Sequence, residues 1–192
     1  MTKNACVPYS LGQIVEWIKG LGASSPMNMD QVLTLLKGMS DSGVSPKQLY
    51  ALLAQRFGQP VLNALAAKQV NAFTRRELED IAQGTPITID ALTTNELTAP
   101  VVRQLNTKRL YDLLEAMGTN SNCIVIMSFA DETTVGGVTI RTVGGGIGHS
   151  VPVRFLGGGK FQSTDVGNGM NGQLWFSKPL RSIQMYPTFV GQ

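Results

Sequence analysis

The segment NCIVIMSFA, residues 122–130, marks the point at which the sequence changes from helical to strand-like patterning. It is a continuous apolar run of strand length, which is typical of a buried strand. Before it, apolar residues recur at spacings of three and four residues, and after it they alternate with polar ones. We therefore expect an α+β protein with a helical half over residues 1–118 and an antiparallel β-sheet half over residues 119–192.

The helical half contains short amphipathic segments, several of which carry start and stop signals. Ser45 and Pro46 are a capping residue and a first-turn proline, and Thr74 with Glu77 forms a capping-box pattern. The expected helices are residues 11–22, 29–39, 45–57, 60–70, 74–84 and 107–118. The first is expected to begin close after Cys6. Residues 85–105 are rich in Thr, Pro and Asn and are expected to form an irregular connection.

The second half reads as strands separated by glycine turns. The expected strands are residues 122–130, 137–143, 149–155, 160–166, 173–177 and 182–190. Glycine clusters at 144–148, 157–159 and 167–172 are expected to form hairpin turns. None of them stands between a strand and a helix, so the sequence indicates no phosphate-binding loop.

Length and composition point to one ordinary globular domain over residues 1–192. The mean hydropathy of +0.04 and the absence of a long apolar run predict no integral membrane segment, and no classical signal peptide is visible. The net charge of +3 is scattered along the chain, so we expect no nucleic-acid partner. With two cysteines and one histidine, neither a disulfide framework nor a metal site is expected, and no cofactor is implied.

Three residues suit nucleophilic catalysis: Cys6, His149 and Asp165. A thiol close to the start of a helix has a lowered pKa, which favours the thiolate. The imidazole of His149, at the start of a strand in the second half, can exchange a proton near neutral pH and could face Cys6 across a groove between the halves. Asp165 lies on the next predicted strand, where its carboxylate could accept the Nδ1–H of His149 and hold the ring in place.

Each of these residues also has a structural interpretation. Cys6 could be an inert thiol, His149 a structural residue, and Asp165 the cap of a turn. Asn168 is an alternative partner for the histidine. The second thiol, Cys123, lies inside the apolar run and is expected to be a buried core residue. Trp17 and Trp175 are expected to belong to the core or to the wall of the groove.

The order of these residues resembles that of the papain-like cysteine peptidases. A cysteine precedes a long helix, a distant Gly-His pair opens a strand, and an aspartate ends the following strand. The closer resemblance is to the YopT/AvrPphB type of bacterial effector protease, on Cys6, Ser10 and Trp17 and on the segment GHSVPVRFLGGGKFQSTDVGNG, residues 148–169. It implies a papain-like fold with its active site in a groove between the halves.

The same resemblance implies a thiol protease that cleaves a peptide or amide bond through Cys6, His149 and Asp165, and a secreted virulence effector that acts in a target cell. The chain departs from the family pattern at Pro8, at Val166, and at the oxyanion donor, for which Asn4 is the nearest amide and the Cys6 backbone N–H the only donor that can be named. Related amide chemistry (glutamine deamidation, transglutaminase-like transfer or peptidoglycan amidase activity) and an inactive interaction module remain alternatives.

Overall fold

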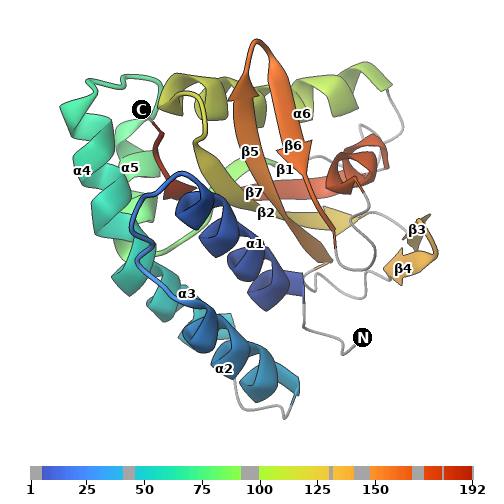
Figure 1. Ribbon diagram of the computed structural model, residues 1–192. Helices are drawn as coiled ribbons and strands as arrows, with labels where there is room; N and C mark the ends of the chain where they lie inside the picture. Colours follow the sequence, from blue (N-terminus) through green and yellow to red (C-terminus); the bar gives the residue numbers. More distant parts are fainter. Residues whose placement is uncertain are drawn as a thin grey trace.

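A five-stranded antiparallel sheet forms the centre of the protein, with the strand order β1-β7-β2-β5-β6. The computed structural model describes residues 6–40, 46–91, 100–129, 132–140, 148–165, 171–178 and 180–191. The strands of the sheet are β1 (Ile87–Ala91), β2 (Asn122–Phe129), β5 (His149–Gly157), β6 (Lys160–Ser163) and β7 (Leu180–Phe189). The hairpin of β3 (Thr133–Val135) and β4 (Val138–Ile140) stands apart from it (Figure 1).

The helices come mainly from the first half of the chain. They are α1 (Cys6–Gly20), α2 (Met29–Ser40), α3 (Pro46–Leu53), α4 (Gln59–Ala67), α5 (Arg75–Gln83) and α6 (Pro100–Met117). A π-helical turn, Ala54–Gly58, joins α3 to α4, and a short 3₁₀ helix, η3 (Gly172–Ser177), precedes β7. The predicted α+β organisation, with helices in the N-terminal half and an antiparallel sheet in the C-terminal half, is therefore confirmed.

Helices cover both faces of the central strand β2. Ile124 and Ile126 belong to the core cluster that includes α1, whereas Cys123 and Val125 belong to the cluster that includes α6. This division follows from the alternation of side chains along a strand. It also explains why residues 123–127 are continuously apolar, since a strand that is covered on both faces presents few positions to water.

Helix α1 packs along β5 and β2 on the side of the sheet that faces the viewer in Figure 1. Four of its apolar residues are completely buried: Leu11, Ile14, Val15 and Ile18. Pro8 lies within the first turns, where the missing N–H of a proline removes no intrahelical hydrogen bond. The helix begins at Cys6 itself. The sequence had predicted a start close after Cys6.

Four further local predictions are wrong. Residues 85–105 contain β1, which pairs with β7, and the first turns of α6, so the helical half also supplies an edge strand. Residues 173–177 form the 3₁₀ helix η3 and not a strand, because Asn171 caps them by accepting from the backbone N–H of Gln173. Strand β6 ends at Ser163, so Asp165 follows the strand and does not lie on it. The expected helix over residues 45–57 passes into the π-helical turn.

Other local predictions are confirmed. The capping box of α5 is present, with the Thr74 hydroxyl accepting from the Glu77 backbone N–H at 3.1 Å. Gly157, which ends β5, and the turn residues Gly158 and Gly159 all have positive φ, so the second glycine cluster forms the predicted hairpin. In the described part of the chain, every helix is too short or too polar to span a bilayer.

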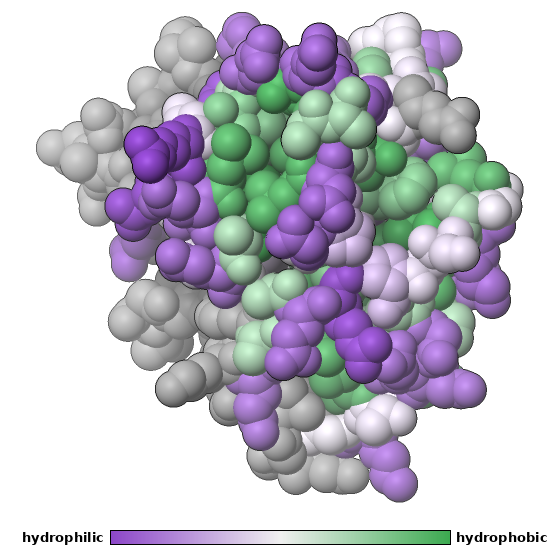
Figure 2. All heavy atoms as spheres, turned by 90° about the vertical axis from the view of Figure 1, so that its left-hand side faces the viewer, coloured by the Kyte–Doolittle hydropathy of each residue, from purple (hydrophilic) through white to green (hydrophobic). Residues whose placement is uncertain are grey.

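The face formed by the helices on the left of Figure 1 carries mixed polarity. Figure 2 shows apolar surface there, bordered by polar side chains. A cavity of about 300 Å³ opens between the segment Ser24–Pro26, helix α4 and the end of β7, and is lined among others by Val61, Ala64 and Phe189. It lies at the C-terminal side of α1, at the opposite end of that helix from Cys6.

Candidate active site

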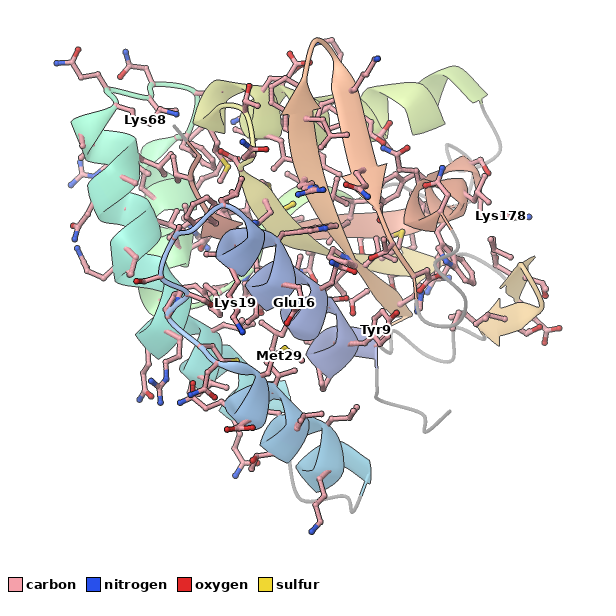
Figure 3. The ribbon with its side chains drawn as sticks, in the orientation of Figure 1. Tyr9, Glu16, Lys19, Met29, Lys68 and Lys178 are labelled. Carbon is pink, nitrogen blue, oxygen red and sulfur yellow. The ribbon has the colours of Figure 1, made fainter. Side chains whose placement is uncertain are left out.

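Cys6 is the first residue of α1, and its side chain is partly buried. The backbone N–H groups of a first helical turn have no partner inside the helix, and they form the positive end of the helix dipole. Ser10 stabilises this turn, because its buried hydroxyl donates to the Cys6 carbonyl oxygen at 2.8 Å. The exposed face of the same helix carries Tyr9, Glu16 and Lys19 (Figure 3).

His149 opens strand β5 opposite Met127 of β2 and is 2% exposed. The residue before it must be a glycine for a steric reason. A Cβ atom on Gly148 would lie 2.4 Å from the Met127 carbonyl oxygen, a separation that real Cβ atoms do not show. The Gly-His pair in the sequence thus marks the place where the chain enters the sheet in close contact with its neighbouring strand.

Asp165 reaches the histidine because of the β5–β6 hairpin. Val153 pairs with Ser163 across this hairpin, and continuing that register brings the residues after Ser163 back toward the start of β5. The Nε2 atom of His149 lies 2.8 Å from Oδ1 of Asp165, and both side chains are buried. The expected pairing is therefore present, but through Nε2 and not through Nδ1.

Trp175 completes the surroundings of the carboxylate. Its indole Nε1–H donates to Oδ2 of Asp165, and its ring packs against the imidazole of His149 with 4.7 Å between the centroids. The side chain is fully buried on η3. Trp175 was predicted to belong to the core or to the wall of the groove, and its contact with Asp165 was not predicted, because no local pattern signals that the indole faces the carboxylate.

The pKa values of Cys6 and His149 are shifted in opposite directions. Burial acts to raise the pKa of the Cys6 thiol, but hydrogen bonding to His149 and its charge, together with the hydroxyl and backbone of Ser150, outweigh burial and lower it. Burial acts to lower the pKa of His149, but its hydrogen bonds and charge interactions with Asp165 and Cys6 raise it to about 9. The two shifts together favour a thiolate–imidazolium pair near neutral pH.

The ring of His149 therefore bridges the two other residues. Because Nε2 bonds to Asp165, Nδ1 is the nitrogen left to interact with the Cys6 sulfur. A thiolate next to an imidazolium, with the imidazolium held by a carboxylate, can attack a carbonyl carbon and then return a proton to a leaving group. The three candidates chosen from the sequence thus lie together.

Cys123 belongs to the core cluster that includes α6, whereas Cys6 packs against the cluster that includes α1. Cys123 is fully buried among the residues packed against α6, and burial raises the pKa of its thiol. Such a thiol stays protonated and is a poor nucleophile. The prediction that Cys123 is a buried core residue is confirmed.

Several other predictions concern residues outside the described ranges. These are Asn4, Val166 and Asn168, together with most of the glycine clusters at 144–148 and 167–172. Asn168 is the alternative partner of His149, and Asn4 is the nearest amide to Cys6 in the sequence. The segments 1–5, 141–147 and 166–170 adjoin the three site residues in sequence and lie outside those ranges too, so the groove over Cys6 stays a prediction.

The described residues offer no cluster of three or more His, Cys, Asp or Glu side chains suited to a metal ion.

Trp17, which was matched to the family helix, is 7% exposed, and the Arg154 guanidinium lies 4.9 Å from the centre of its ring. Gln13 accepts from the Thr164 hydroxyl at 3.1 Å, so α1 is tied directly to the residue before Asp165. Neither the Arg154 nor the Thr164 contact was predicted from the sequence.

Comparison with protein-family models, with curated proteins and with solved structures gave no significant match for this chain.

Proposed function

We propose that the protein is a cysteine hydrolase of the papain-like kind, which cleaves a peptide or related amide bond through Cys6, His149 and Asp165. The observation that supports this most strongly is the position of His149. Its buried ring bonds to Asp165 through one nitrogen and interacts with a thiol of lowered pKa through the other. A structural histidine has no need of a helix-terminal cysteine as its second partner.

In the proposed reaction, the Cys6 thiolate attacks the substrate carbonyl carbon, and the carbonyl oxygen takes up negative charge. His149 donates its Nδ1 proton to the leaving amine as the carbon–nitrogen bond breaks, which leaves a thioester on Cys6. The now neutral Nδ1 accepts a proton from water as the water attacks the thioester. The acid product leaves, and the thiolate–imidazolium pair is restored.

The remaining residues would orient the base and stabilise charge. Asp165 would stabilise the imidazolium and fix the ring through Nε2, and Trp175 would hold the carboxylate through its other oxygen. The backbone N–H of Cys6 is the available oxyanion donor, because the first N–H groups of a helix have no intrahelical acceptor.

The proposed substrate is a protein or peptide. Tyr9 is 40% exposed on α1, three residues after the nucleophile, where it could contact a bound chain. The resemblance to bacterial effector proteases extends the proposal to a secreted virulence protein acting in a target cell. In a reducing cell interior the free thiol of Cys6 would stay active.

The proposal is tested by incubating the purified chain with a diverse mixture of unstructured peptides and analysing the products by mass spectrometry. Peptide fragments from the wild type, and none from Cys6→Ala, are the expected result. Conversion of glutamine to glutamate, joining of an amine to glutamine, or cleavage of peptidoglycan stem peptides alone would replace protease with one of the related amide chemistries. No product of any kind, together with ordinary reactivity of Cys6 toward iodoacetamide at pH 6, would instead favour an inactive interaction module.

A further inference from the structure

We infer that Ser150 is a second hydrogen-bond donor to the Cys6 sulfur, which helps His149 to hold that sulfur as the anion. This role rests on the proposed function, because it concerns the same nucleophile. It assigns part of the activation of the thiol to a residue that keeps its own proton throughout the reaction.

The strand geometry places Ser150 on the α1 side of the sheet. Residues Val151 and Val153 of β5 belong to the core cluster that includes α6, so Ser150 and Arg154 lie on the opposite face. Arg154 contacts Trp17 of α1, which confirms the side. Ser150 pairs across the sheet with Ile126, another residue of the α1 cluster, and it follows His149 directly.

The burial of Ser150 makes its hydroxyl unusual. The residue is 1% exposed, yet its Oγ makes no hydrogen bond of ordinary length to any described nitrogen, oxygen or sulfur atom. The other buried serines nearby are paired: Ser10 donates to the Cys6 carbonyl oxygen, and Ser163 donates to the Pro152 carbonyl oxygen at 2.7 Å. A buried hydroxyl without a partner is unfavourable, so an unpaired one at a reactive site requires an explanation.

The Cys6 sulfur supplies that explanation. Helix α1, which begins with Cys6, packs against β5 on the face that carries Ser150, and the hydroxyl and backbone of Ser150 act to lower the pKa of the thiol. A neutral thiol is a weak hydrogen-bond acceptor, whereas a thiolate in a largely buried site accepts strong hydrogen bonds from nearby donors. The hydroxyl thus gains a strong partner only when Cys6 is ionised, and this difference favours the ionised form.

Ser150 and His149 would then have separate tasks. His149 must give up its Nδ1 proton to the leaving group, so it cannot both catalyse and remain a constant donor to the sulfur. The Ser150 hydroxyl has a pKa far above neutral and keeps its proton. It stabilises the thiolate before attack and loses that partner when the thioester forms, and it is therefore expected to influence the first step more than the second.

The test is the pH dependence of Cys6 alkylation by iodoacetamide in the full chain, which requires no knowledge of the substrate. Loss of the hydroxyl in Ser150→Ala should move the acid limb of the profile to higher pH by roughly half a unit to one unit. The higher pH step, at which His149 loses its proton and the reactivity of the thiolate changes, should stay near its wild-type position because Asp165 still holds the ring. Below the acid limb the alkylation rate should fall roughly 3- to 10-fold, as that shift implies.

Ser163→Ala is the matched control. It removes another buried hydroxyl, on the neighbouring strand, that bonds to a backbone carbonyl oxygen and not to the sulfur. It should change stability and leave the acid limb in place. If Ser150→Ala does not fold, the pair Ser150→Thr and Ser150→Val serves instead, because the two side chains have the same shape and only threonine has a hydroxyl.

The outcomes separate this inference from the proposed function. A wild-type profile with a low acid limb that is unchanged in Ser150→Ala, or equal in the threonine and valine variants, overturns the role of Ser150 and leaves the proposed function standing. A wild-type profile of an ordinary thiol overturns both. A shift in Ser150→Ala and not in Ser163→Ala supports the inference.

Discussion

The Nε2 atom of His149 lies 2.8 Å from Oδ1 of Asp165, although the two residues are separated by a complete hairpin. The other carboxylate oxygen accepts from the indole of Trp175, which also packs on the imidazole ring. The orientation of the histidine is therefore set by a carboxylate that is itself held from its far side. This arrangement makes the choice between Asp and Asn at position 165 experimentally informative.

Asp165→Ala should lower kcat by roughly 100-fold or more while leaving substrate binding and the fold nearly intact. Asp165→Asn should retain more activity, because its amide oxygen can still accept the Nε2–H of His149. Its NH₂ group, however, would then face the indole N–H of Trp175, which is also a donor. Removing that donor in Asp165→Asn/Trp175→Phe should recover part of the lost activity, as measured by kcat and KM.

The double variant provides its own control. Trp175→Phe alone is expected to reduce kcat, because the Asp165 carboxylate loses a donor. In the Asp165→Asn background the same change should instead raise kcat, and a double variant that is less active than Asp165→Asn would contradict the expected conflict between the two N–H donors. Asn168→Ala should have far less effect than Asp165→Ala. The reverse order would transfer the orienting role to Asn168.

Cys6→Ala should abolish activity, whereas Cys123→Ala should retain most of it. Cys6 begins a helix and faces His149, but Cys123 belongs to the core cluster that includes α6 and has a raised pKa. Because Cys123 is fully buried, its truncation should cost about 1–2 kcal/mol of unfolding free energy. Specific activity checks the difference between the two variants, and thermal unfolding checks the loss of stability in Cys123→Ala. Equal loss of specific activity in two correctly folded variants would show that Cys6 is not the nucleophile.

Activity should follow a bell-shaped pH profile. As pH falls through the lowered pKa of Cys6, the thiolate is protonated and the nucleophile is lost. As pH rises through about 9, His149 loses the proton that the leaving group needs. The measurement is kcat/KM against pH, and a rate that still increases at pH values well above 9 would indicate an unactivated thiol.

Gly148→Ala should displace His149 by a purely steric effect. The new Cβ atom would collide with the Met127 carbonyl oxygen, so the start of β5 must move away from β2. We expect a loss of more than about 1 kcal/mol in stability and a larger proportional loss of activity. Gly20→Ala is the control, because nothing lies within 4 Å of the position at the end of α1, and it should be close to neutral. Comparable effects in the two variants would refute the steric explanation.

The sequence by itself indicated much of the local structure and the three candidate site residues. Helical spacing, the Thr74 capping box and the continuous apolar run of residues 122–130 are local signals, and they correctly predicted α5, β2 and the α+β organisation. The candidates Cys6, His149 and Asp165 were predicted from residue type, from their positions beside expected helices and strands, and from their order along the chain, all of which can be read from the sequence.

The tertiary structure alone decided which atoms meet. Residues 87–91, ITIDA, do alternate apolar and polar side chains, but the run is short and lies among Thr, Pro and Asn residues, and pairing with β7 is what makes it strand β1. Which histidine nitrogen bonds to Asp165 depends on the register of the β5–β6 hairpin, and the contacts of Trp175 and Ser150 depend on how η3 and α1 pack against β5. Each of these contacts joins segments far apart in the chain, so no local pattern encodes it, and the packing of side chains across the sheet is what brings the groups within bonding distance.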